Sequence, residues 1–420
     1  MKGIKLPLIS SPSLFFDYLS FCRSVNINTI NSIISIGSLS AYNQFLLQQE
    51  IYSLFMKKFS EFKFLDIRSI KHQIFYFPEA MTRLDSLCEL ICDTSIDYSY
   101  FYGLARICQN IQRLIIVNVT PKPNCGIAKL IEVQKNLKHF EWTDNFDDDY
   151  FTDGPYKEIF FELERKANNL DHLELFFLYF ESFDTIMQGL LPKLDKIKTL
   201  IINEFSFINE NLLKMLAYND LEILNIDYIT IDEASIIIEN SGGRLKEVSL
   251  KPCDFLNYED DFSDDSLIFI RKIYKNCPLI EYLSLAFSPS KDHFTEFENL
   301  LKICQHLKSL LLITSNIHRV RETEEKIFEN GKELLKILIR SAPTNLRELR
   351  LFDDFKFSLE ALKEFLEKWR GRPALTVLTS DSIYQDVDYQ KLINNYKNDG
   401  VIKNFRYESI MNIENLNFKI

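Results

Sequence analysis

Glycine and proline are scarce in this 420-residue sequence, which contains 11 and 12 of them. A chain with so few loop-forming residues should consist mostly of strands and helices with short connections. Long hydrophobic runs are missing as well, because no stretch of 18 or more apolar residues occurs, and we predict no membrane-spanning helix. Pro7 and Pro12 interrupt the first apolar stretch, which argues against a secretory signal, so we expect a cytoplasmic or nuclear protein.

Positive charge is in deficit, with 49 basic residues against 60 acidic ones and a net charge of −11. This balance argues against general nucleic-acid binding, which needs a basic face, although a local basic patch stays open. The sequence also lacks a glycine-rich nucleotide-binding loop and a nucleophile elbow. We therefore predict a protein that is not an enzyme and that holds no cofactor.

Metal-binding spacings are also absent. None of the six histidines stands in an HExxH pattern or beside paired cysteines, which predicts no metal site. The acidic runs at 147–149 and 259–261 lack the order of a calcium-binding EF-hand loop. We interpret them as solvated loops, with a protein-docking rim or a calcium site as alternatives.

What the sequence does contain is a recurring hexad with apolar residues at its first, fourth and sixth positions. Leu245-Lys-Glu-Val248-Ser-Leu250 is one copy. Other clear copies begin at Leu170, Leu221, Leu307 and Leu346, and weaker ones at Phe62, Leu87, Ile111, Leu137, Ile197, Ile280, Leu375 and Ile402. Most steps between copies are 24 to 29 residues, and the three longer steps of 33, 35 and 39 residues mark insertions. A short strand repeated at this period is typical of leucine-rich repeats.

The segments between hexads carry helix signals. Thr230 and Glu233 have the spacing of a capping box, and Gly242 and Gly243 follow as a stop. Strand, turn and helix in alternation predict an α/β fold: a leucine-rich-repeat solenoid shaped as a ribonuclease-inhibitor-like horseshoe, with a parallel sheet on the concave face and helices on the convex face. We expect residues 1–60 to form a helical N-terminal cap and residues 61–420 to form about thirteen repeats.

The eight cysteines are scattered, and a chain of this size does not need disulfides, so reduced thiols are expected. Cys108, Cys277 and Cys304 each precede the first apolar position of a hexad by three residues. A position that recurs in this way predicts a buried slot that cysteine fills as a small hydrophobic residue.

The residues between the apolar positions of each hexad should line the concave face. This mixture of polar residues with scattered aromatics predicts a protein-binding surface, since Phe, Tyr and Arg are typical interface anchors. The predicted binding residues are Arg113, His139, Glu141, His172, Glu174, Phe176, Asn203, Asn225, Asp227, Glu247, Lys251, Tyr282, Glu348, Arg350 and Phe352. His139 and His172 hold the same place in their hexads. The simple interpretation is that they are ordinary polar residues in contact with solvent, and a functional role is the alternative.

The hexads with a preceding cysteine resemble the repeats of F-box/leucine-rich-repeat proteins. The opening is more specific: "LFFDYLSFCR" at 14–23, "INSIISIG" at 30–37 and "QFLLQQEI" at 44–51. These segments resemble the F-box-like proteins of arbuscular mycorrhizal fungi, and the resemblance covers nearly the whole chain. It implies that the repeats hold the substrate of an SCF-type cullin–RING ubiquitin ligase.

The first sixty residues depart from that family's pattern. They contain no Trp, and Leu6-Pro7 does not lead into the helices of an F-box. The resemblance therefore implies a substrate-recognition part from which the F-box itself is absent, so that SCF components would join only if an F-box is present elsewhere. A leucine-rich-repeat interaction protein with no link to a ligase is the alternative.

Overall fold

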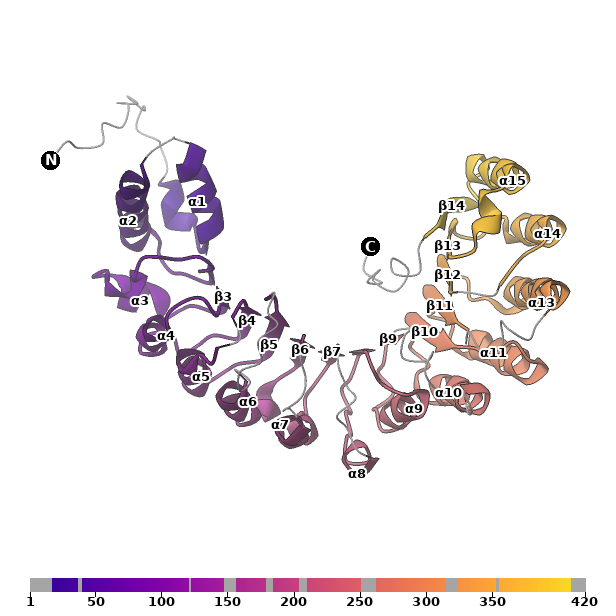
Figure 1. The fold of residues 1–420 in the computed structure, drawn as a ribbon, viewed down its shortest axis with the longest axis horizontal. Coiled ribbons are helices and arrows are strands. Elements are labelled where there is room, and N and C mark those ends of the chain that lie inside the picture. The colour runs from indigo at the N-terminus through magenta and orange to yellow at the C-terminus, as the bar shows by residue number, and fades with distance from the viewer. Residues whose placement is uncertain are drawn as a thin grey trace. The chain divides into compact units, whose positions relative to one another are not determined.

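The computed structural model describes residues 17–36, 40–120, 122–146, 156–178, 184–203, 210–250, 262–314, 323–352 and 355–408. The chain divides into two compact units, Met1–Leu194 and Asp195–Ile420, called unit 1 and unit 2 below. Each unit repeats one pattern, in which a short strand leads into a helical segment that returns the chain to the start of the next strand (Figure 1).

Unit 1 contains six parallel strands among its described residues. They are β1 (Ser24–Asn26), β2 (Phe64–Asp66), β3 (Glu89–Asp93), β4 (Arg113–Asn118), β5 (His139–Asp144) and β6 (His172–Phe176). Its α-helices are α1 (Ile27–Ile36), α2 (Ala41–Lys58), α3 (Ala80–Leu84), α4 (Tyr98–Ala105), α5 (Cys125–Glu132), α6 (Lys157–Glu164) and α7 (Asp184–Leu190). The strands pair in sequence order from β1 to β6, which makes the sheet of this unit a simple stack of repeats.

Unit 2 continues the same pattern within itself. Its described strands are β7 (Thr199–Ile202), β8 (Ile223–Ile226), β9 (Glu247–Leu250), β10 (Tyr282–Ala286), β11 (Ser309–Ile313), β12 (Glu348–Phe352), β13 (Leu375–Thr379) and β14 (Ile402–Tyr407). Its α-helices are α8 (Glu210–Leu213), α9 (Ile231–Glu239), α10 (Phe262–Asn276), α11 (Lys291–Ile303), α13 (Glu324–Ser341), α14 (Leu359–Trp369) and α15 (Val387–Asn398). These strands also pair in parallel and in sequence order.

The core of each unit lies between the sheet and the helices on one of its faces (Figure 1). Successive side chains of a strand point to opposite faces, so β4 alternates half-buried and buried residues, with Leu114 and Ile116 inside. Helices contribute the opposite wall, as Phe160 of α6 does against Phe140 and Trp142 of β5. The other sheet face, which corresponds to the predicted concave face, is called the open face below.

The predicted leucine-rich-repeat solenoid is confirmed. The thirteen hexads fall on strands β2 to β14, and crossover helices join the parallel strands. The helix signals hold as well: Thr230 Oγ1 accepts the Glu233 N–H at 3.1 Å, the Glu233 carboxylate accepts the Thr230 N–H at 2.9 Å, and α9 starts there. Gly243 follows the helix with a φ of 75°, a value that glycine adopts without strain.

The predicted frame of the hexad that begins at Leu375 is wrong by one residue, because it starts one position too far along the chain. The sequence assigned Leu375, Leu378 and Ser380 to the core of this repeat. However, Val377 and Thr379 pair with the core residues Leu349 and Leu351 of β12. A shift of one residue exchanges the two faces of a strand. The apolar residues on both sides of this strand concealed the correct alternation, because Leu375 and Leu378 are buried too.

The N-terminal segment differs from a purely helical cap. Strand β1 lies inside it and pairs with β2 through Val25 and Leu65, ahead of the first hexad. Helices α1 and α2 follow the strand, as the apolar spacing predicts, but the described residues before β1 form only a 3-10 turn at Tyr18–Phe21. Residues 24–58 therefore begin the repeat stack.

The recurrent cysteine slot is confirmed. Cys108, Cys277 and Cys304 are fully buried, and each donates its backbone N–H to the carbonyl four residues earlier in the preceding helical segment. Burial raises the pKa of each of these thiols to about 12. The acidic runs at 147–149 and 259–261 lie outside the described residues.

Candidate functional site

The open face of unit 1 brings together the first five residues predicted for binding. The alternation of β5 and β6 buries Phe140 and Leu173 and turns His139, Glu141, His172 and Glu174 to the open face. The parallel register places His139 beside His172 and Glu141 beside Glu174. In β4, Arg113 lies beside His139. The two histidines therefore form one row across β5 and β6, and the two glutamates form a second row next to it.

Arg113 links three strands by ion pairs. Its Nη1 donates to Glu89 Oε1 of β3 at 3.1 Å, and its Nη2 donates to Glu141 Oε1 of β5 at 2.9 Å. Sequence reasoning left out Glu89, although it stands at the same hexad position as Arg113 and His139. Burial by itself would raise the pKa of Glu141, but hydrogen bonds from His139 and Arg113 outweigh it and lower that pKa to about 2. Glu141 is therefore a carboxylate at neutral pH.

The two histidines stack on each other. Their ring centroids are 3.7 Å apart and their planes differ by 8°. His139 Nε2 pairs with Glu141 Oε1, and His172 Nε2 lies 3.6 Å from Glu174 Oε2. His172 Nε2 is buried and has no hydrogen-bond partner, which is uncommon for a polar nitrogen.

These side chains also include a set that could hold a metal ion. One ligand atom each from His139, Glu141 and His172 lie within 4.8 Å of one another. The sequence predicted no metal site because that prediction used spacings along the chain. In the structure, the three side chains converge from two neighbouring strands.

Phe176 ends this face as an exposed aromatic side chain. It is 41% exposed and lies at the end of β6 beside Thr143 of β5. An exposed phenylalanine next to a row of linked charges has the composition of a protein-binding surface, since aromatic anchors surrounded by polar groups dominate such interfaces.

The open face of unit 2 is less accessible than predicted. Asn203, Asn225, Glu247 and Tyr282 are half-buried, whereas Asp227, Glu348 and Arg350 are buried. Lys251 and the side chain of Phe352 lie outside the described part of the structure. The Arg350 guanidinium pairs with Glu348, whose Oε1 also accepts from Ser309 Oγ at 3.0 Å. These three residues form a buried polar cluster on a face that the hexad pattern marks as exposed.

A pocket of about 390 Å³ lies at the starting ends of β10 to β14. It combines the predicted residues Tyr282 and Glu348 with Lys308, Arg347 and Lys403, which sequence reasoning missed. Lys308 and Arg347 each stand one residue before a strand begins. The alternation of inward and outward residues along the strand therefore does not predict where their side chains lie. Lys308 Nζ is 2.5 Å from Glu281 and 5.9 Å from the centre of the Tyr282 ring.

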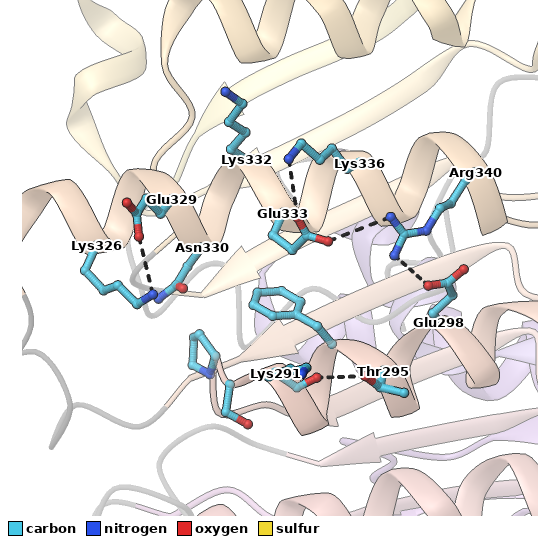
Figure 2. Close-up of a pocket in the computed structure, with 13 residues that line it drawn as sticks. Lys291, Thr295, Glu298, Lys326, Glu329, Asn330, Lys332, Glu333, Lys336 and Arg340 are labelled. Atoms are coloured by element: carbon cyan, nitrogen blue, oxygen red, sulfur yellow. Dashed lines mark hydrogen bonds and ion pairs between the residues drawn. The ribbon is translucent and has the colours of Figure 1, made fainter.

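A larger pocket of about 560 Å³ lies between helices α11 and α13 (Figure 2). Five basic residues and three glutamates line it, together with Phe294 and four other residues. Arg340 of α13 joins the two helices, because its Nη2 is 2.6 Å from Glu298 of α11. The lysines Lys326 and Lys336 pair with glutamates three residues away in their own helix (Figure 2). Pairs of this kind are usual on solvated helices, so this pocket is weaker as a site than the open face of unit 1.

No family model matches the sequence, and no curated protein matches it. Among solved structures, the chain is similar to a chain of the Rad7 and Elc1 complex in yeast, with 16% identity, coverage of 83% of this chain and 91% of that one, and a TM-score of 0.44. It is also similar to the leucine-rich-repeat protein LegL7 from Legionella pneumophila, with 13% identity, coverage of 79% and 98%, and a TM-score of 0.36. For a protein from Bacteroides fragilis the identity is 13%, the coverage 71% and 66%, and the TM-score 0.30.

Among the described residues, no helix is long and apolar enough to cross a membrane.

Proposed function

We propose that this protein is an interaction scaffold whose open face in unit 1 binds a protein partner. The observation that carries the proposal is the exposed Phe176 at the edge of a preorganised charged network. Arg113 holds Glu89 and Glu141 in place before any partner arrives, so little side-chain ordering remains to be done on binding. The charges would orient a partner, and the phenylalanine would supply the apolar contact.

The more specific proposal is that the chain is the substrate-recognition part of an F-box-type SCF ubiquitin ligase adaptor, without catalysis of its own. The resemblance of residues 14–51 to the fungal F-box-like family motivates this proposal. Within such an adaptor, the open face of unit 1 would hold the substrate. Among the described side chains of the predicted binding set, Phe176 of unit 1 is the exposed one, which supports placing the substrate there.

A stand-alone interaction protein is the second candidate. The observation that favours it is strand β1, which joins residues 24–58 to the repeat sheet through its pairing with β2. A segment that serves as the first repeat of the stack is not organised as a separate ligase-recruiting module. Under this alternative the open face binds a partner, but no ubiquitin ligase is recruited.

Comparative affinity capture tests the binding face. Phe176→Ala should weaken capture of the protein that the wild-type chain enriches by about 10-fold or more, because a buried aromatic anchor contributes about 2 kcal/mol. Phe161→Ala is the matched control, since Phe161 is 48% exposed on helix α6 and not on the sheet. Equal capture by wild type and Phe176→Ala, measured by quantitative mass spectrometry, would contradict the proposed face.

The same captures separate the two candidates. Cullin and linker subunits recovered together with the partner would support the adaptor, and a partner recovered without them would support the stand-alone protein. Direct titration of the purified chain with the SCF linker subunit is the second measurement. Tight binding there would contradict the expectation that the chain lacks an F-box.

A further inference from the structure

We propose that His139, Glu141 and His172 form a binding site for Zn²⁺, with Glu174 as the fourth ligand. The site lies on the open face of β5 and β6, where the register pairs the two histidines and the two glutamates. Both strands carry the same His-x-Glu sequence, His139-Phe-Glu141 and His172-Leu-Glu174. Since alternate residues of a strand point to one face, each strand presents one imidazole and one carboxylate to the open face. His139, Glu141 and His172 converge there, and Glu174 Oε2 lies 3.6 Å from His172 Nε2.

The donor set suits zinc. Imidazole nitrogens and carboxylate oxygens are its ordinary ligands besides cysteine, and four of them complete a tetrahedral site. Calcium and magnesium take oxygen ligands, so a pair of histidines selects against both. The net charge of the cluster also favours a divalent cation. Three carboxylates (Glu89, Glu141 and Glu174) and one guanidinium (Arg113) give a net charge of −2 when both imidazoles are neutral. A divalent cation would neutralise this charge.

The distances require only a small adjustment. The three ligand atoms lie within 4.8 Å of one another, whereas the ligand atoms of a tetrahedral zinc are about 3.4 Å apart. The stacked rings must tilt so that their lone pairs converge. Rotation about the bond to a histidine ring is broad and costs little, and both rings are half-buried at an open surface. The imidazoles can therefore turn toward a shared ion.

Two polar atoms of this cluster are available to bind an ion. His172 Nε2 is buried without a hydrogen-bond partner, and a bound ion would supply that partner. Arg113 Nη2 and His139 Nε2 both pair with Oε1 of Glu141, and within the described part of the structure Oε2 accepts no hydrogen bond. Arg113 would then act as a positioning residue that orients the carboxylate toward the ion, as residues behind metal ligands commonly do.

Titration of the tag-free, metal-stripped full chain with Co²⁺ and then Zn²⁺ tests the site. The wild type should bind one Co²⁺ with the intense visible absorption of a tetrahedral complex, and Zn²⁺ should displace it. His172→Ala and Glu141→Gln should each weaken Zn²⁺ binding by about 100-fold. His306→Ala is the matched control, since His306 is exposed in unit 2 outside the cluster, and it should bind like the wild type.

Unchanged fluorescence of the buried Trp142 would show that each variant of unit 1 is folded. The proposed site would be overturned if folded His172→Ala bound Zn²⁺ as tightly as the wild type. It would also be overturned if His306→Ala lost as much Zn²⁺ affinity as His172→Ala. Glu174→Gln should weaken binding by about 10-fold, and no change there would overturn its assignment as a ligand. The titration involves no protein partner, so its failure would leave the proposed binding function standing.

Discussion

The two units use an arginine–glutamate pair on the same sheet face in opposite ways. In unit 1, Arg113 reaches from β4 to Glu89 and Glu141, and its side chain is 42% exposed. In unit 2, Arg350 pairs with Glu348 of its own strand, and its side chain is 1% exposed. Water screens the first pair but is excluded from the second. The same residue types therefore form a solvent-accessible network in one unit and a buried contact in the other.

The difference matters for stability because burial changes the cost of losing one partner. A solvent-exposed ion pair typically contributes less than about 1 kcal/mol. A charge left unpaired in the interior costs about 3–5 kcal/mol. The chain's two tryptophans allow each unit to be followed separately, since Trp142 is buried in unit 1 and Trp369 in unit 2.

The largest effect is expected at Arg350. Arg350→Met should lower the free energy of unfolding of unit 2 by about 3–5 kcal/mol, because Glu348 would be left buried without its guanidinium. Urea unfolding followed by Trp369 fluorescence, in a Trp142→Phe background, measures this loss. Adding Glu348→Gln should recover part of it by removing the unpaired charge. A loss below about 1 kcal/mol would show that the pair is not buried in solution.

An intermediate change in the free energy of unfolding is expected when Glu141 is protonated at low pH. Its pKa of about 2 lies below the ordinary value for glutamate, so its contribution to stability is complete above about pH 5 and declines as the pH falls toward 2. Between pH 5 and pH 3 this carboxylate should account for a loss of about 2 kcal/mol.

Urea unfolding of unit 1, followed by Trp142 in a Trp369→Phe background, checks this value. Glu141→Gln should remove that part of the pH dependence, and Glu174→Gln is the control on the neighbouring strand. Identical pH profiles for wild type and Glu141→Gln would contradict the network drawn around this residue.

The smallest effect is expected at Arg113. Arg113→Met should change the free energy of unfolding of unit 1 by no more than about 1 kcal/mol, because both of its ion pairs face solvent. The measurement is the same Trp142-reported urea curve. A loss as large as that of Arg350→Met would remove the contrast between the units and would assign Arg113 a structural role.

The fold was predictable because its signals are local. Leu245, Val248 and Leu250 recur as buried positions at a steady period, and Thr230 with Glu233 starts a helix by contacts within four residues. Where the local signal was ambiguous, the prediction failed. Apolar residues on both faces of β13 moved its frame by one residue, and β1 is too short for a hexad to identify.

The candidate site was predictable in part. The positions of Arg113, His139 and His172 on the open face follow from the alternation of their strands. Their contacts do not, because the pairing of neighbouring strands stacks His139 on His172 and brings Arg113 within hydrogen-bond distance of Glu141. The burial of Glu348 and Arg350 was not visible in the hexads, since alternation gives the face of a residue but not how accessible that face is.

The sequence by itself determined the repeat, its parallel strands and the side of the sheet on which each hexad residue lies, because these follow from spacings along one strand or helix. Only the tertiary structure decided which residues meet across strands and which are removed from water. Those outcomes depend on residues far apart in the chain. For this reason the His-x-Glu pairs of β5 and β6 look like ordinary surface residues in the sequence and form a potential metal site only when the two strands lie side by side.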